Sequence, residues 1–231
     1  MPTPANALAI MAKAPLAGAV KTRLVPPLTP AQAAEFYRAL LLDQFDHLRH
    51  YAGAERYVFF APADAENTLR DLGGAEYAYL AQSGGDLGAR MQQIFTALWH
   101  LGHRNIILIG SDLPAVPWAI LDEGFAQLAQ TESRLVLGPS RDGGYYLVGM
   151  NRPTPEIFAD MTWSHERVLA ETTARLDALD LTYNILPTWF DLDVAEDFQR
   201  LWTLSRTESR GVLSRTLLFL QQSGLWPPSK V

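Results

Sequence analysis

The 231-residue chain has no cysteine. Disulfide bonds, thiolate zinc sites and cysteine nucleophiles are therefore excluded together, and a cytoplasmic protein is the expected class because disulfides are typical of oxidising compartments. Long hydrophobic runs are also missing near the start of the chain. Residues 7–12 form a continuous apolar stretch, which is too short for the apolar part of a signal peptide or for a membrane span. We expect neither of these segments.

Basic residues are too few to make the chain positively charged. Nineteen Lys and Arg stand against 25 Asp and Glu, which gives a net charge of -6. A negative field repels nucleic acid phosphates and anionic lipids, so we expect neither nucleic acid nor a membrane as a partner. The composition carries no signal of an oligomeric state.

Apolar residues are abundant and regularly distributed. Hydrophobic residues make up 48% of the chain and aromatic residues 10%, enough to bury a sizeable core. Short apolar runs alternate with amphipathic segments, as expected for strands and helices. We predict strands at residues 7–12, 56–61, 77–80, 105–110, 134–138, 145–150 and 181–186, and helices at about 30–51, 64–72, 87–101, 118–130, 164–178, 194–204 and 209–222.

This alternation predicts one α/β domain over residues 1–231, with three layers and helices on both faces of the sheet. Residues 134–138 and 145–150 are joined by a short connection that contains Gly-Gly, which is typical of a β-hairpin. The sheet should therefore be mixed but mostly parallel. The last helix, about 209–222, should pack on the main body, because no repeat or long linker divides the chain.

A cationic loop follows the first predicted strand. This loop contains Gly18 and three cations, Lys13, Lys21 and Arg23, and residues 13–24 include no acid. Ligands of open α/β sheets bind beyond the carboxyl ends of the strands. Three cations can neutralise a di- or triphosphate, and a glycine lets backbone N–H groups approach it. A solvated basic loop would have the same composition, so both interpretations remain open.

Acidic residues follow two other predicted strands. Asp112 comes soon after residues 105–110, and Asp191 and Asp193 follow residues 181–186. Two carboxylates together with phosphate oxygens suit a hard divalent cation such as Mg²⁺ or Mn²⁺. An Asp before Leu-Pro is also typical of a helix N-cap or a turn, so this pattern has two interpretations as well.

Three familiar catalytic patterns are missing. A P-loop would need glycine at positions 15 and 20, where Pro15 and Val20 stand. No G-x-G-x-x-G follows the first strand, which disfavours a dinucleotide-binding dehydrogenase. Ser140 lacks the final glycine of a nucleophile elbow, which disfavours a serine hydrolase.

Six blocks of the sequence resemble a known bacterial family. They are KAPLAGAVKTRL at 13–24, GGDLGARM at 84–91, GSDLP at 110–114, RDGGYYLVG at 141–149, WS at 163–164 and DLDVAEDF at 191–198. Their order and spacing resemble GT-A-fold nucleotide-diphospho-sugar transferases, described as glycosyltransferases associated with arsenosugar biosynthesis. The blocks are also similar to nucleotidyltransferases of this fold, including 2-phospho-lactate guanylyltransferase and the molybdenum-cofactor nucleotidyltransferases.

The resemblance implies a single GT-A domain and a metal-dependent transfer of a sugar from a nucleotide-diphospho-sugar to a small acceptor. One alternative is the transfer of a nucleoside monophosphate from a nucleoside triphosphate to a phosphorylated small molecule. Another is a nucleotide-binding protein without activity. The implied site residues are Lys13, Gly18, Lys21 and Arg23 for the phosphates, Asp86 and Arg90 for the nucleotide side, Asp112 and Asp193 for Mg²⁺ or Mn²⁺, and Asp142, Gly143 and Gly144 for the acceptor.

The implied catalytic residues are Asp112, Asp142 and Lys21. Asp142 is expected to take a proton from the attacking hydroxyl of the acceptor. Its place before Gly143 and Gly144 is equally typical of a plain hairpin turn. Asp191 could exchange roles with Asp193, and His165 is a further candidate base.

Overall fold

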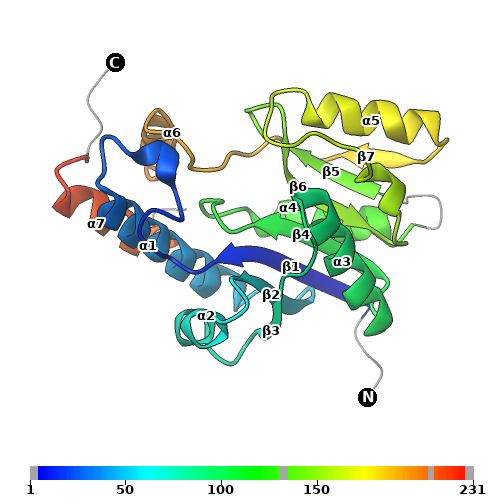
Figure 1. The fold of residues 1–231 in the computed structure, drawn as a ribbon, viewed down its shortest axis with the longest axis horizontal. Coiled ribbons are helices and arrows are strands. Elements are labelled where there is room, and N and C mark those ends of the chain that lie inside the picture. The colour runs from blue at the N-terminus through cyan, green and yellow to red at the C-terminus, as the bar shows by residue number, and fades with distance from the viewer. Residues whose placement is uncertain (1–4, 131–134, 208–210, 227–231) are drawn as a thin grey trace.

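The computed structural model describes residues 5–130, 135–207 and 211–226 (Figure 1). Arg134, the predicted first residue of a strand, lies outside these ranges, as do residues 209–210 at the predicted start of the last helix. Among the described residues, none of the helices is both long and apolar enough to cross a membrane.

One seven-stranded sheet forms the centre of the molecule, in the spatial order β3-β2-β1-β4-β6-β5-β7. β6 runs antiparallel to both of its neighbours, and the other neighbouring strands are parallel. The prediction of a mixed, mostly parallel sheet with a hairpin is therefore confirmed. The strands are β1 (Asn6–Lys13), β2 (Glu55–Ala61), β3 (Ala78–Ala81), β4 (Asn105–Gly110), β5 (Leu135–Pro139), β6 (Tyr145–Met150) and β7 (Tyr183–Ile185).

Helices cover both faces of this sheet (Figure 1). Side chains alternate along β1: Leu8 and Ile10 contact the core beneath α1, α2 and α4, whereas Ala7 and Ala9 face the core beneath α3 and α5. Alternation of this kind is the two-residue period of a strand. The helices are α1 (Pro30–Leu48), α2 (Glu66–Gly73), α3 (Leu87–His100), α4 (Trp118–Leu128), α5 (Val168–Ala178), α6 (Asp197–Leu204) and α7 (Ser214–Gln222).

Local signals explain where several helices begin. Thr29 forms a capping box with Gln32 at the start of α1, and Pro30 occupies the first turn. Three helices begin several residues later than the sequence predicts, and one of them is the last helix, α7, which begins at Ser214 after residues 211–213, which lie outside it. The predicted start of α5 at Ser164 is wrong because Ser164 adopts a left-handed conformation with φ of 66°, which an α-helix does not accommodate, and the helix begins at Val168. α6 begins at Asp197, whose side chain accepts hydrogen bonds from the turn before it.

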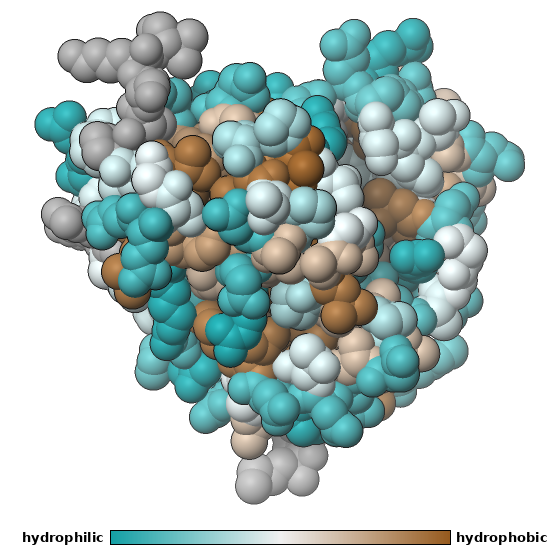
Figure 2. Space-filling view, turned by 60° about the vertical axis from the view of Figure 1, so that its left-hand side comes forward, coloured by the Kyte–Doolittle hydropathy of each residue, from teal (hydrophilic) through white to brown (hydrophobic). Residues whose placement is uncertain are grey.

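α7 packs against the outer side of α1. The buried Asp43 of α1 accepts hydrogen bonds from the backbone N–H groups of Arg215 (3.1 Å) and Thr216 (2.8 Å) at the start of α7. Apolar residues of α1, α6 and α7 form a third core cluster beside these bonds. Figure 2 brings this side of the molecule forward and shows small apolar patches among polar residues.

Candidate active site

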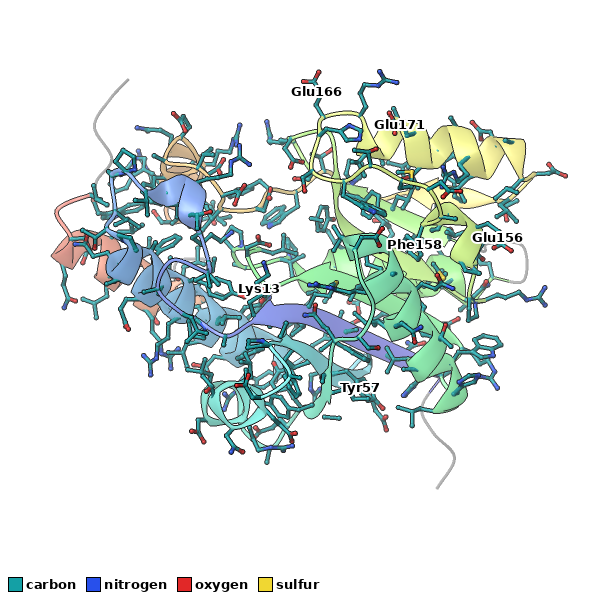
Figure 3. The ribbon with its side chains drawn as sticks, in the orientation of Figure 1. Lys13, Tyr57, Glu156, Phe158, Glu166 and Glu171 are labelled. Carbon is teal, nitrogen blue, oxygen red and sulfur yellow. The ribbon has the colours of Figure 1, made fainter. Side chains whose placement is uncertain are left out.

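A cleft of about 790 Å³ opens where the carboxyl ends of β1 and β4 meet. Its size is that of a small-molecule binding site. Lys13 stands at the carboxyl end of β1, and Glu166 lies farther along the chain, in the segment before α5 (Figure 3). The cleft is lined by the first loop, the start of α3, the loop after β4, the β5–β6 hairpin, residues 163–168 and residues 191–193.

Two predicted cations and two predicted acids meet in one corner of this cleft. Lys21 Nζ donates a hydrogen bond to Asp112 Oδ2 at 2.8 Å and lies 3.6 Å from Asp193 Oδ1. The guanidinium of Arg23 pairs with the carboxylate of Asp193. Burial by itself would lower the pKa of Lys21, but the charge and hydrogen bond of Asp112 and the charge of Asp193 outweigh it and raise that pKa above its ordinary value.

Backbone contacts hold the two carboxylates in place. The N–H of the buried Leu192 donates to the carbonyl of Asp112 at 3.1 Å, which joins the loop after β4 to residues 191–193. Gly110 leaves room for the carboxylate of Asp112, since a Cβ there would lie 2.7 Å from Asp112 Oδ1. These contacts place both acids at one end of the sheet although they are far apart in the sequence.

Sequence analysis did not single out Asp197, which orients Asp193. Its Oδ2 accepts hydrogen bonds from the N–H groups of Asp193 and Val194, each at 2.9 Å, and its carboxylate pairs with Arg200. Asp197 is only 4% exposed. An acid in the first turn of a helix, directly after a loop that carries candidate site residues, is the signal by which such a supporting residue could be found.

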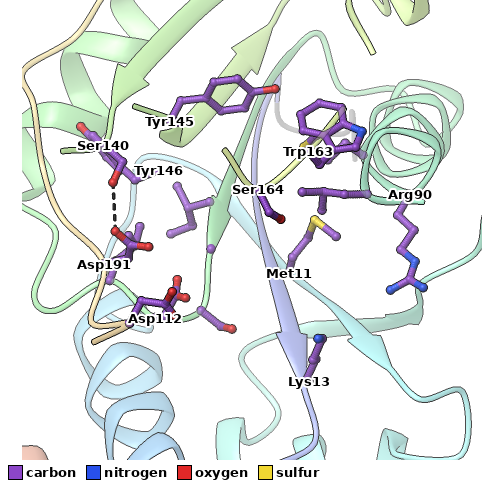
Figure 4. Close-up of a pocket in the computed structure, with 18 of the residues that line it drawn as sticks. Met11, Lys13, Arg90, Asp112, Ser140, Tyr145, Tyr146, Trp163, Ser164 and Asp191 are labelled. Atoms are coloured by element: carbon purple, nitrogen blue, oxygen red, sulfur yellow. Dashed lines mark hydrogen bonds between the residues drawn. The ribbon is translucent and has the colours of Figure 1, made fainter. Parts of the chain in front are cut away.

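Another carboxylate, that of Asp191, lies on the same side of the cleft as Asp112 (Figure 4). Ser140 Oγ donates a hydrogen bond to Asp191 Oδ1 at 2.9 Å, drawn as the dashed line in Figure 4. Burial, and after it the charges of Asp112 and Asp142, raise the pKa of Asp191 to about 6, although the bond from Ser140 lowers it. Asp191 and Asp193 thus have different partners.

Of the three predicted residues in the β5–β6 hairpin, two line the cleft and one contacts the segment before α5. Asp142 and Gly144 line the cleft, and Asp142 Oδ1 accepts the N–H of Gly144 at 3.0 Å, as in a turn. Gly143 is not among the lining residues. Its φ is 90°, and a Cβ there would lie 1.9 Å from the carbonyl oxygen of Glu166. Gly143 therefore allows the hairpin to contact the segment before α5.

The other predicted residues occupy different places. Asp86 and Arg90 line the cleft, and Asp86 also caps α3 by accepting the N–H of Ala89 at 2.8 Å. Gly18 lies outside the cleft, in a small depression beside it. His165 lines the cleft, but Nδ1 accepts the N–H of Arg167 and Nε2 is bonded to the carbonyl of Thr162. Both ring nitrogens of His165 are therefore engaged.

Apolar side chains line the side of the cleft opposite the acids. Figure 4 shows Trp163, Met11 and Arg90 on one side, facing Asp112 and Asp191 on the other. The indole of Trp163 packs on the first turn of α3, since a Cβ at Gly88 would lie 2.8 Å from it. The cleft therefore combines an acidic side with a side on which apolar side chains lie beside the cation of Arg90.

Residues 44–165 match the model of a family described as uncharacterized proteins conserved in bacteria (DUF2064). The chain belongs to this family. No curated protein matches it. The family description names no activity, so functional comparison has to come from solved structures.

Several solved structures with the same fold are named for transfer reactions or for the synthesis of nucleotide-linked products. A crystal structure from Desulfovibrio desulfuricans G20, named as a candidate nucleotide-diphospho-sugar transferase, is 26% identical with a TM-score of 0.81, over 94% of this chain and 97% of that one. A cytidylyltransferase from Leptospira borgpetersenii is 13% identical with a TM-score of 0.61, over 98% of both chains. A CMP:2-keto-3-deoxy-manno-octonic acid synthetase complexed with CTP is 11% identical with a TM-score of 0.53, over 87% of this chain and 98% of that one.

These likenesses confirm the resemblance on which the sequence analysis relied. The chain is related to transferases, and its fold is that of the nucleotide-diphospho-sugar transferases. The cytidylyltransferase and the synthetase share the fold at low identity, so they do not identify a substrate.

Proposed function

We propose that this protein is a metal-dependent glycosyltransferase-like enzyme that transfers a sugar from a nucleotide-diphospho-sugar to a small acceptor. The observation that carries the proposal is the meeting of Lys21, Asp112 and Asp193 in a cleft of suitable size. The name of the structure from Desulfovibrio desulfuricans, 26% identical over nearly the whole chain, supports the choice of donor.

The residues of the charged corner fit a divalent cation that is shared with a substrate. Within the described ranges, no three His, Asp or Glu side chains are grouped so that they could hold a metal ion by themselves. Mg²⁺ is commonly held by one or two carboxylates together with substrate phosphates. Asp112 and Asp193 would supply those carboxylates, and the cation would neutralise charge on the departing diphosphate.

The charges along the cleft support the need for a cation. Among the described residues, five carboxylates line it, those of Asp86, Asp112, Asp142, Asp191 and Asp193, against the four cationic side chains of Lys13, Lys21, Arg23 and Arg90. The cleft by itself is therefore not positively charged. A donor diphosphate would be bound more favourably with a divalent cation than without one.

In the proposed reaction, Lys13, Lys21 and Arg23 bind the diphosphate of the donor. Asp142 accepts the proton of the acceptor hydroxyl, whose oxygen forms a bond with the anomeric carbon. The bond between that carbon and the phosphate oxygen breaks, and the nucleoside diphosphate leaves with the electron pair. Trp163 and the apolar side of the cleft exclude water from the reacting atoms.

Nucleotidyl transfer is the second candidate. The observation that favours it is that Lys13, Lys21 and Arg23 all line the cleft, since a triphosphate carries more negative charge for these cations to bind than the diphosphate of a nucleotide sugar does. In that reaction, a phosphate oxygen of the acceptor attacks the α-phosphorus of a nucleoside triphosphate. The bond from that phosphorus to the β-phosphate breaks, and pyrophosphate leaves.

A thermal-shift screen tests the two candidates together. Nucleotide sugars and nucleoside triphosphates are added singly, each with and without Mg²⁺ or Mn²⁺, because a ligand that binds only the folded state raises Tm. A metal-dependent shift with a nucleotide sugar supports the first candidate, and a shift confined to a triphosphate supports the second. No shift with any nucleotide contradicts both.

Product formation with the selected donor then separates an enzyme from a binding protein. Asp112→Asn should abolish turnover with little loss of stability, because it removes a charge from the metal site but retains the size of the side chain. Asp71→Asn is the matched control, since Asp71 is exposed on α2 and does not line the cleft. Binding without product from any acceptor would identify a nucleotide-binding protein, and full activity of Asp112→Asn would remove Asp112 from the site.

A further inference from the structure

We propose that Lys21 occupies the position between Asp112 and Asp193 that a divalent cation requires, so that the cation binds tightly only after a polyphosphate draws the ammonium away. Lys21 thereby makes binding of the cation depend on binding of the donor. This inference rests on the metal site of the proposed function.

The contacts of Lys21 are those of a competing cation. Its Nζ lies 2.8 Å from Asp112 Oδ2 and 3.6 Å from Asp193 Oδ1, so one ammonium bridges both carboxylates. The side chain of Lys21 is 5% exposed, whereas those of Asp112 and Asp193 are 31% and 33% exposed. A cation arriving from the cleft can reach the carboxylates but meets the ammonium already between them.

The backbone keeps the ammonium at this position. Lys21 adopts a left-handed conformation with φ of 48° and ψ of 38°, immediately before the 3-10 turn Thr22–Leu24. This conformation is unfavourable for a residue other than glycine and has to be maintained by its surroundings. The N–H of Leu24 donates to the carbonyl of Lys21 at 3.0 Å, and the Leu24 side chain is completely buried.

A tethered ammonium has a high effective concentration at the two carboxylates. A divalent cation that binds alone must remove it and leave a charged side chain without its partners, which is costly in a partly buried site. A polyphosphate changes both conditions. Its oxygens can accept hydrogen bonds from the ammonium of Lys21. They can also occupy the coordination positions of the cation that two carboxylates leave open.

Arg23 provides a natural comparison. Its guanidinium also pairs with Asp193, but its side chain is 67% exposed. It therefore contacts one of the two carboxylates from the solvent side, whereas Lys21 lies between both. Removing Arg23 should affect cation binding much less than removing Lys21 does.

Titration with Mn²⁺ in the absence of nucleotide tests the inference. Binding is followed through the loss of the electron paramagnetic resonance signal of free Mn²⁺ for the wild type, Lys21→Met and Arg23→Met. Lys21→Met should bind Mn²⁺ at least about tenfold more tightly than the wild type, because two carboxylates lose the ammonium that neutralises them. Arg23→Met should change the affinity by about twofold. Adding Asp112→Asn to Lys21→Met should abolish the gain.

Equal Mn²⁺ affinities for the wild type and Lys21→Met would overturn the inference. The proposed function would survive that result if the wild type still forms product in a metal-dependent way. The absence of both Mn²⁺ binding and turnover would overturn the inference and the proposed function together.

Acetylation of the wild type gives a second measurement if Lys21→Met does not fold. The chain has three lysines, Lys13, Lys21 and Lys230, so mass spectrometry can follow each one. Without metal, Lys21 should react much more slowly than the exposed Lys13. Mn²⁺ at a concentration that occupies the site should accelerate the acetylation of Lys21 severalfold relative to Lys13. An unchanged ratio at full occupancy would overturn the inference.

Discussion

Asp191→Asn should stabilise the folded protein near neutral pH. Burial, and then the charges of Asp112 and Asp142, raise the pKa of Asp191 from 3.8 to about 6. The folded state therefore retains a proton on Asp191 over a pH range in which the unfolded state has lost it. Stability falls as the pH rises through this range, and the full penalty is reached above a pH of about 6.

The magnitude follows from the two pKa values. The change from 3.8 to about 6 corresponds to a penalty of up to about 3 kcal/mol above the upper value. Asparagine does not ionise, and its Oδ1 can still accept the hydrogen bond from Ser140. The gain from Asp191→Asn should therefore be small at about pH 4, grow up to about pH 6 and stay constant above it.

Urea unfolding of the wild type and Asp191→Asn, with EDTA present throughout, measures this difference. The free energy of unfolding is extrapolated to zero urea at several values between about pH 4 and about pH 8. Asp71→Asn is the control, because Asp71 is exposed on α2, away from the cleft. A stability difference for Asp191→Asn that does not vary with pH would refute the reasoning, since the burial and the neighbouring charges would then not act on its ionisation.

Three further substitutions test the supports of the fold and the site by urea unfolding. Gly143→Ala should lower the unfolding free energy far more than Gly18→Ala, because both have positive φ but only the Cβ at Gly143 meets the backbone of Glu166; similar losses would contradict this. Asp197→Ala should cost about 2–4 kcal/mol, because it leaves two turn N–H groups without an acceptor, and should weaken Mn²⁺ binding in the Lys21→Met background. Unchanged Mn²⁺ affinity would show that Asp197 does not orient the site. Asp43→Ala should cost about 2–4 kcal/mol through the lost bonds to α7, and a loss below about 1 kcal/mol would mean that apolar contacts alone hold that helix.

Most elements could be predicted because their signals are local. Four consecutive aliphatic residues mark β4, and Thr29 and Pro30 mark the start of α1. The starts of α5 and α6 could not be predicted in this way. They depend on the left-handed conformation of Ser164 and on the side chain of Asp197, and neither leaves a periodic pattern in the sequence.

The sequence predicted which charged residues follow the strands and line the candidate site. It did not predict which of these side chains contact one another. Sequence alone left Asp191 and Asp193 interchangeable, because they belong to one short motif. The structure separates them: Asp193 faces Lys21 and Arg23, whereas Asp191 accepts a hydrogen bond from Ser140. Neighbours in a loop can point in different directions, and only the packing of that loop decides which.

The sequence by itself excluded every class of site that needs cysteine. It also determined the alternation of strands and helices, and it placed cations and acids directly after predicted strands. These properties depend on composition and on residues close together in the chain. Only the tertiary structure decided that the ammonium of Lys21 lies between Asp112 and Asp193. Lys21 and Asp112 are 91 residues apart. Their contact depends on the parallel register of β1 against β4, with Ile10 beside Ile109, and on the burial of Leu24 in the turn that follows Lys21. A contact of this kind is set by the packing of distant segments, which no local pattern encodes.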